Sequence, residues 1–230
     1  SVVSSYSTFE NNGTLGNGTP GTEPTWTSEG KIAGAYTFDG NNTFIELIPD
    51  SINLTEEFTV ETWIYNNVLS PTSIIFSGGI KIGVSSNALV IYNSTDDSPG
   101  TCSGGGVNIN QWQHIAVTYS VENKIELYIN GTKIALSGSS CDYEHKINSS
   151  LRIGNDKNGT FGFNGSIDEV KIYNRELSPE QIKYNYESGL VNTSITKIVG
   201  NETKKYQDWS VTITPTDTVH DGPNVSSNNI

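Results

Sequence analysis

The stretch "KIELYINGTKIAL", residues 124–136, decides the fold class of this chain. Its two halves alternate apolar and polar side chains, and Asn130-Gly131 lies between them. An Asn-Gly pair between two alternating runs is the strongest short-range signal for a two-residue hairpin loop. The stretch therefore predicts an antiparallel hairpin, and with it a protein built mainly from β-strands.

Alternation of this kind continues on both sides of the hairpin. Residues 56–66, "EEFTVETWIYN", have a period of two, which predicts a half-buried strand with one face toward a core. Similar runs predict two strands in 31–47 around a turn at Asp39-Gly40, three strands in 73–93, and single strands in 111–120, 151–156 and 165–174.

One helix is predicted, in "SPEQIKYNYESG", residues 178–189. Ser178 is placed as the N-cap, Pro179 as the first helical residue and Gln181 as the partner that completes a capping box. Gly189 is expected to end the helix. Residues 1–190 are thus predicted to form a two-sheet antiparallel β-sandwich with one short helix, although the first 30 residues show little pattern.

Several of these segments together resemble a known family. They are "AYTFDGNNTFIEL", "FTVETWIYN", "QWQHIAVTYS", "IELYINGTKIAL", "LRIGND" and "FNGSIDEVKIYNRELSPEQI", in this order. The series is similar to the laminin-G-like branch of the concanavalin A-like lectin/glucanase jelly rolls and covers about residues 9–190. This resemblance implies a jelly-roll domain, mostly non-catalytic, of the kind found in extracellular, adhesive and carbohydrate-binding proteins.

The chain departs from that family at both ends. Residues 1–15, "SVVSSYSTFENNGTL", align almost at once with a segment that follows an apolar strand in the relatives, so an opening strand is expected to be missing. The region 191–230 forms a predicted extended β tail, and it resembles the last strands of a bacterial or archaeal immunoglobulin-like repeat.

This tail has the side-chain pattern of a strand that joins another sheet. In "DWSVTITPTD", residues 208–217, Trp209, Val211 and Ile213 fall on one face. A subunit that lacks a strand and carries a spare one can join copies of itself head to tail, and such a contact gives a filament when it does not close. The alternatives are that the tail is a linker or a remnant of a neighbouring domain, or that it docks in its own sandwich.

Composition excludes some partners. The net charge of −12 argues against a nucleic-acid binder, because little here could neutralise phosphates. No apolar run approaches the roughly 18 residues that predict a membrane span. The chain starts at Ser1 and contains no Met, and we therefore expect that a leader was removed.

Cysteines and glycosylation motifs indicate an extracellular location. Cys102 and Cys141 lie in Gly/Ser-rich stretches and predict one disulfide, with two free thiols as the alternative. There are also twelve Asn-X-Ser/Thr motifs, about twice the number expected by chance, and some of them are equally good turn sequences. The predicted glycosylation sites are Asn12, Asn17, Asn41, Asn53, Asn93, Asn130, Asn148, Asn158, Asn164, Asn192, Asn201 and Asn224.

The resemblance also implies a structural calcium ion. The segments around Asp39 and Asp168 lie near each other in the relatives and often hold calcium there, with Asn42 as a further oxygen ligand. The alternative is an Asp turn and a solvated strand aspartate, with no ion.

Signs of catalysis are poor. The row of alternating acids that glucanases use is absent, and the histidines His114, His145 and His220 are scattered along the chain. Trp63 and Trp112 are predicted to be packing residues. We therefore expect a non-enzymatic extracellular protein: the N-glycosylated subunit of a surface filament joined by strand complementation or, alternatively, an adhesive module that binds surface polysaccharide.

Overall fold

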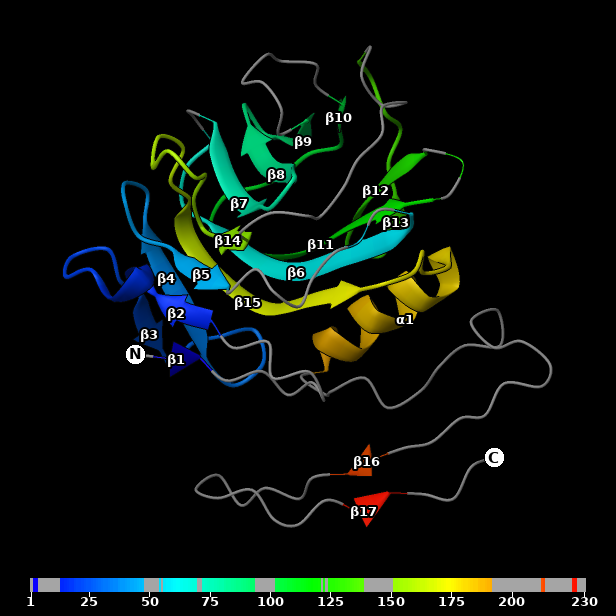
Figure 1. Ribbon diagram of the computed structural model, residues 1–230. Coiled ribbons are helices and arrows are strands. Elements are labelled where there is room, and N and C mark those ends of the chain that lie inside the picture. The colour runs from blue at the N-terminus through cyan, green and yellow to red at the C-terminus, as the bar shows by residue number, and fades with distance from the viewer. Residues whose placement is uncertain are drawn as a thin grey trace. The chain divides into compact units, whose positions relative to one another are not determined.

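The computed structural model divides the chain into two units, Ser1–Thr196 and Lys197–Ile230. The residues that it describes are 2–3, 13–47, 54, 56–69, 72–93, 102–120, 122, 124–138, 151–191, 212–213 and 225–226. The first unit is a sandwich of two antiparallel sheets with one helix, as Figure 1 shows, and the predicted fold class is confirmed. Among the described residues, no helix is long and apolar enough to cross a membrane.

The first sheet has eight strands. In spatial order they are β1 (Val2–Val3), β2 (Gly13–Leu15), β5 (Ile45–Leu47), β14 (Leu151–Ile153), β7 (Ser73–Ser77), β8 (Ile80–Ser85), β9 (Ala88–Asn93) and β10 (Cys102–Gly104). A short 3-10 turn, η1 (Gly16–Gly18), follows β2. No strand was expected before residue 13, but β1 pairs with β2 and makes one edge of this sheet.

The second sheet has seven strands. In spatial order they are β13 (Thr132–Lys133), β12 (Ile125–Ile129), β11 (Trp112–Tyr119), β6 (Phe58–Asn66), β15 (Asn164–Tyr173), β4 (Ala35–Asp39) and β3 (Thr25–Thr27). The predicted hairpin joins β12 to β13, and both of its loop residues have positive φ, 51° at Asn130 and 70° at Gly131. Since a type I′ turn requires two such residues, the Asn-Gly pair explains the tight turn.

The turn at Asp39-Gly40 does more than reverse the chain. The strands on its two sides, β4 and β5, do not pair with each other, because β4 belongs to the second sheet and β5 to the first. This turn therefore carries the chain from one layer of the sandwich to the other.

Strand β6 is buried on both faces, so the prediction of a half-buried strand was wrong. Its even-numbered residues, such as Phe58 and Ile64, face the core between the sheets. Its odd-numbered residues Glu61 and Trp63 are only 1% and 3% exposed, because helix α1 (Pro179–Leu190) covers this outer face, as seen in Figure 1. Helix α1 is thus an integral layer of the fold.

The Ser178 N-cap and the first helical residue Pro179 are as predicted, but the end of α1 is not. The hydroxyl oxygen of Ser178 accepts a hydrogen bond from Gln181 N, and Pro179 is the first helical residue. Gly189, however, does not end the helix, which continues to Leu190. A Cβ at Gly189 would lie 2.5 Å from Cζ2 of Trp63, so this glycine is required for close contact between helix and sheet.

The second unit contains two short strands. β16 (Thr212–Ile213) pairs antiparallel with β17 (Val225–Ser226). Trp209 and Val211, which we expected to act with Ile213 in assembly, lie outside the described residues, and the strand-donor role remains a prediction.

We predict that Gly189→Ala destabilises the protein, although Ala is the better helix former by about 1 kcal/mol. The added methyl group collides with Trp63, and overpacking of this kind costs about 1–3 kcal/mol. Urea unfolding followed by tryptophan fluorescence measures the change. Glu187→Ala, an exposed position of the same helix, is the control and is expected to change stability by less than about 0.5 kcal/mol. A stabilised Gly189→Ala variant would contradict the packing argument.

Candidate functional site

The outer face of the second sheet is only partly covered by α1. Helix contacts reach Glu61 and Trp63 on β6, through Asn185 and Tyr186. The next outward-facing residue on β6 is Tyr65, because side chains alternate along a strand. We use the name outer stripe for six neighbouring residues beyond these helix contacts: Thr37, Asn67, Tyr65, Trp112, Asn164 and Ser166.

Strand register brings the outer stripe together from four strands. Ser166 of β15 lies opposite Thr37 of β4 on one side and Tyr65 of β6 on the other. Tyr65 in turn lies opposite Trp112 of β11. One row of side chains thus runs across the sheet and combines two hydroxyls with two aromatic rings.

Direct contacts hold the stripe in place. The hydroxyl oxygens of Thr37 and Ser166 are 2.9 Å apart and hydrogen-bonded. The rings of Tyr65 and Trp112 meet edge to face, with centroids 5.7 Å apart at an interplanar angle of 64°. Beside the row, Asn67 Nδ2 donates to Asn164 Oδ1 at 3.0 Å. Five of the six side chains are half-buried and that of Asn67 is exposed, so the stripe is ordered and still open to solvent.

The three tryptophans with described side chains have different environments. Trp63 is buried, and its ring stacks on Tyr186 with centroids 5.7 Å apart, so its predicted packing role is confirmed. Trp112 is half-buried at the stripe and has an accessible part that the packing prediction missed. Trp26, on edge strand β3, is 61% exposed.

The predicted calcium ligands do not converge. Asp39 lies opposite Asn164, whereas Asp168 is four residues farther along β15, or roughly 13 Å at the usual rise per residue. Asn42 is exposed in the turn that follows Asp39. In the described part of the chain no group of three His, Cys, Asp or Glu residues could hold a metal ion. Binding of a structural calcium ion remains a prediction, and these three residues do not form one ligand set for it.

Both aspartates instead accept hydrogen bonds from nearby backbone. Burial alone would raise the pKa of Asp39, but donors from Asn41 and Thr43 outweigh it and hold the pKa below its usual value. Burial raises the pKa of Asp168, against the hydrogen bond that Ile32 N donates to Oδ2 at 2.8 Å. Each carboxyl thus has a local structural role. The Asp turn of the alternative reading is found at Asp39, whereas Asp168 is buried and not solvated as that reading expected.

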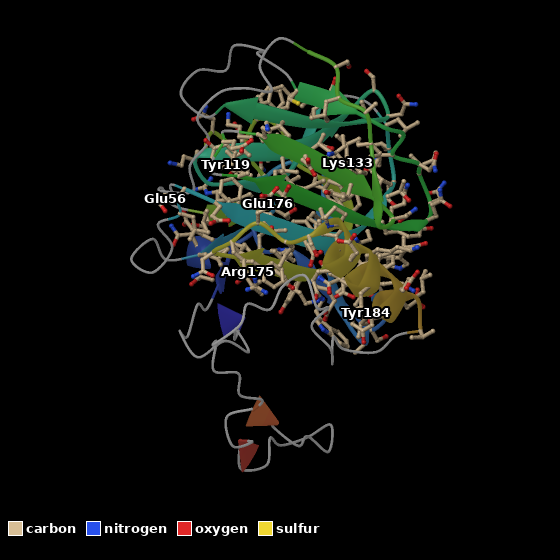
Figure 2. All side chains as sticks on the ribbon, turned by 90° about the vertical axis from the view of Figure 1, so that its right-hand side faces the viewer. Glu56, Tyr119, Lys133, Arg175, Glu176 and Tyr184 are labelled. Atoms are coloured by element: carbon tan, nitrogen blue, oxygen red, sulfur yellow. The ribbon has the colours of Figure 1, made fainter. Side chains whose placement is uncertain are left out.

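An acidic surface lies beyond the N-terminal end of α1. Figure 2 labels Glu176, Arg175 and Lys133 on the side of the second sheet that faces the viewer. Burial raises the pKa of Glu176, and the neighbouring charges of Glu126 and Glu57 raise it further. Burial first, and repulsion between these carboxylates second, explain the raised pKa of Glu176, and the shift gives no sign of an ion or a catalytic acid.

A buried polar cluster lies between α1 and β6. Glu61 accepts a hydrogen bond from Asn185 Nδ2 at 2.8 Å and one from the Tyr173 hydroxyl. His114 Nε2 is 3.9 Å from Glu61 Oε1. His114 is 3% exposed and packs on Trp63, which agrees with its prediction as a strand residue that faces its neighbours. A substrate could not reach these groups, so the cluster gives no positive sign of catalysis.

The remaining predicted sites are partly described. Cys102 is fully buried in β10, but Cys141 lies outside the described residues, and the disulfide remains a prediction. The side chain of Asn93 is also outside them, as are Asn12, Asn53, Asn148, Asn192, Asn201 and Asn224. The glycosylation motifs with described side chains begin at Asn17, Asn41, Asn130, Asn158 and Asn164.

Comparison with known proteins identifies the family. A profile of laminin-G type, described as the concanavalin A-like lectin/glucanases superfamily, matches residues 39–183, more than half of the chain. The chain therefore belongs to the concanavalin A-like lectin/glucanase superfamily. No curated protein sequence matches it.

Solved structures show the same fold at low sequence identity. The binding domain of botulinum neurotoxin serotype G has a TM-score of 0.56 and 15% identity, over 81% of this chain and 50% of that one. A SAP-like pentraxin from Limulus polyphemus has a TM-score of 0.54 and 16% identity, over 65% and 80%. Trypanosoma rangeli sialidase has a TM-score of 0.54 and 14% identity, over 70% and only 28%. This chain thus spans half or less of the toxin domain and of the sialidase.

The buried histidine gives a pH prediction. Burial lowers the pKa of His114 to about 3, and the charge of Lys171 acts in the same direction. Since the unfolded state binds this proton near pH 6.5, folding stability should fall as the pH drops below that value, by at most about 1.4 kcal/mol per pH unit. Urea unfolding at pH 6.5 and 5.0 measures the slope.

His114→Gln is expected to flatten this pH dependence, and His145→Gln serves as the control. Most carboxyl groups have ordinary pKa values below this interval, and the raised pKa of Asp168 and of Glu176 acts in the opposite direction, because these two groups bind protons more tightly in the folded state. An unchanged slope in His114→Gln would show that another group is responsible.

Proposed function

We propose that this protein is a non-enzymatic extracellular module that binds neutral carbohydrate at the outer stripe. The observation that carries the proposal is the ordered pair of Tyr65 and Trp112 beside the hydroxyls of Thr37 and Ser166. The lectin-like fold of the family supports it, since members of this superfamily include lectins.

The chemistry of the stripe fits a saccharide. A sugar ring has an apolar C–H face and a rim of hydroxyl groups, so it can contact an aromatic ring and exchange hydrogen bonds with hydroxyl and amide groups. The stripe offers both kinds of group side by side, on strands of one sheet. Because neighbouring strands are about 4.8 Å apart, the row from Thr37 to Trp112 spans roughly 14 Å, enough for a short oligosaccharide.

Charge favours a neutral ligand. All six side chains of the outer stripe are uncharged, and the whole chain has a net charge of −12. This field would repel acidic polysaccharides at low ionic strength. Neutral glycans at a cell surface or in an extracellular matrix are therefore the proposed partners.

An extracellular location is consistent with several features. Twelve glycosylation motifs and two cysteines are the sequence features that suit a secreted chain. A Cys102–Cys141 bond would close a long loop and stabilise the fold by about 4 kcal/mol on the chain-entropy account. Full burial of Cys102 agrees with a structural role for its sulfur.

Binding can be tested by affinity electrophoresis in gels that contain neutral glucans, mannans or galactans. Trp112→Ala should weaken the interaction by about fivefold, since an aromatic contact contributes about 1 kcal/mol beyond buried area. Asn67→Ala changes an exposed residue of the stripe and should weaken it less, without risk to the fold.

Trp26→Ala is the matched control, because Trp26 is exposed but lies on β3 outside the stripe. It should bind as the unmodified protein does. Equal loss in Trp26→Ala and Trp112→Ala, or no binding of the unmodified protein to any of these polysaccharides, would contradict the proposal.

A second candidate function is that of a filament subunit. It is favoured by the two-stranded sheet of β16 and β17, since an isolated two-stranded sheet is marginally stable and gains from pairing with further strands. A neighbouring copy could supply those strands at the edge of its own sandwich. Head-to-tail repetition of that contact would then give a fibre.

Negative-stain imaging of the native particle tests this candidate. If strand donation holds copies together, Trp209→Ala should leave separate subunits where the unmodified chain forms fibres, because the donated strand loses its largest apolar side chain. Far-UV circular dichroism would confirm that the sandwich stays folded. Fibres of unchanged length in Trp209→Ala would contradict strand donation.

A further inference from the structure

We infer that, of the glycosylation motifs with described side chains, those at Asn17 and Asn158 are open acceptor sites for N-glycans, while those at Asn41, Asn130 and Asn164 are closed. The inference rests on the proposed extracellular location. It concerns only the five glycosylation motifs whose side chains are described. Four of these motifs read Asn-Gly-Thr or Asn-Gly-Ser, so differences among them come from the fold rather than from the residues of the motif.

The motif at Asn17 is open along its whole length. Asn17 and Thr19 are both exposed, in and directly after the η1 turn. Gly18 between them has φ of +73°, and a Cβ placed there would meet no atom within 4 Å. A transferase can therefore approach the asparagine amide and the threonine hydroxyl together.

The motif at Asn158 has nearly the same geometry. Asn158 and Thr160 are exposed in the loop between β14 and β15. Gly159 has φ of +70°, and a Cβ there would again have no neighbour within 4 Å. The two motifs thus share sequence, exposure and a left-handed central glycine.

The motif at Asn164 is closed by the sheet. Its residues belong to β15, which is bonded to β4 on one side and to β6 on the other. Asn164 Oδ1 accepts from Asn67, and a Cβ at Gly40 would lie 3.0 Å from Asn164 Nδ2. A Cβ at Gly165 would lie 2.0 Å from the carbonyl oxygen of Tyr65. These contacts hold the Asn164 amide and the backbone of its motif against the neighbouring strands, so a transferase cannot reach the motif in an open conformation.

The motif at Asn130 is closed by the hairpin and by α1. Asn130 Oδ1 accepts a hydrogen bond from His114 N at 2.9 Å, which fixes the amide against β11. A Cβ at Gly131 would lie 3.0 Å from the Tyr186 ring and 3.1 Å from Lys183 Cα. The helix therefore blocks the approach of a transferase to the middle of this motif.

The motif at Asn41 is closed at its third residue. Asn41 is exposed, but Thr43 is only 7% exposed. The Thr43 hydroxyl donates to Asp39 Oδ1 at 2.8 Å and accepts from Asp39 N at 2.9 Å. Since the hydroxyl of the motif is part of what makes the acceptor, its burial removes this site from the folded protein.

The two open sites lie at neighbouring loops. Gly16 N, beside Asn17, donates to Phe44 O at 2.8 Å. The Arg152 guanidinium lies 4.1 Å from the Phe44 ring centre, and Arg152 Nη1 donates to Lys157 O, beside Asn158, at 3.0 Å. Glycans on both sites would shield one end of the sandwich, and the bare Asn164 would leave the outer stripe accessible.

The reaction needs a lipid-linked sugar phosphate as its donor. A bond forms between the asparagine Nδ2 and the anomeric carbon of the sugar, and the bond from that carbon to the phosphate oxygen breaks. The amide loses one proton, and the lipid phosphate leaves. No oxidant or reductant is required.

The test is glycopeptide mass spectrometry on the full chain, secreted from a host that performs N-glycosylation. High occupancy is expected at Asn17 and Asn158, and low occupancy at Asn41, Asn130 and Asn164. Thr19→Ala and Thr160→Ala should each remove the mass of one glycan, because each destroys an open motif on an exposed residue.

Ser166→Ala is the matched control, since it destroys the motif at Asn164 and should leave the glycan mass unchanged. Occupancy at any of the three closed sites equal to that at Asn17, or an empty Asn17 and Asn158, would overturn the inference. Binding to neutral polysaccharides is measured separately through Trp112→Ala, so failure of that proposal and failure of this inference are distinguishable.

Discussion

The fold depends on covering both faces of the central strand β6. Its inner face packs in the core between the sheets, and its outer face holds Trp63 against the ring of Tyr186 and the backbone of Gly189. Lys31 belongs to the loop before β4, and its ammonium group lies 5.0 Å from the centre of the Trp63 ring. One tryptophan therefore fixes a strand, a helix and a loop, and its burial in place of exposure contributes about 2–3 kcal/mol.

This packing also determines which part of the sheet can have a function. Where α1 lies on the outer face, it covers buried polar groups such as Glu61, which accepts a hydrogen bond from Asn185 of the helix, and nothing can enter. Where the helix ends, the same alternation along β6 and β11 exposes Tyr65 and Trp112. The outer stripe is thus a direct consequence of a helix that is twelve residues long and stops at Leu190.

Local patterns predicted the fold well, and long-range register was not predictable. The Asn130-Gly131 loop and the Ser178 cap depend on neighbouring residues, and both are confirmed. Strands β2 and β3 are each three residues long, which is too short for a period of two to be recognised in the sequence. Pairing with neighbouring strands holds them in place. Gly189 was misread because a glycine that ends a helix and one that touches a tryptophan look alike in sequence. The outer stripe combines residues from four strands that are far apart in the sequence. The separation of Asp39 from Asp168 depends on the same strand register.

The glycosylation motifs show that nearly identical sequences differ in accessibility according to their place in this fold. Asn17 and Asn164 begin motifs that differ only in Thr or Ser, yet one lies in an open turn and the other within a strand paired on both sides. A glycan on Asn164 would replace the amide contact to Asn67 and cover the row from Thr37 to Trp112. Pairing of β15 with both neighbouring strands would therefore keep a glycan off the proposed ligand surface, and glycans at the proposed acceptor sites Asn17 and Asn158 would lie on loops.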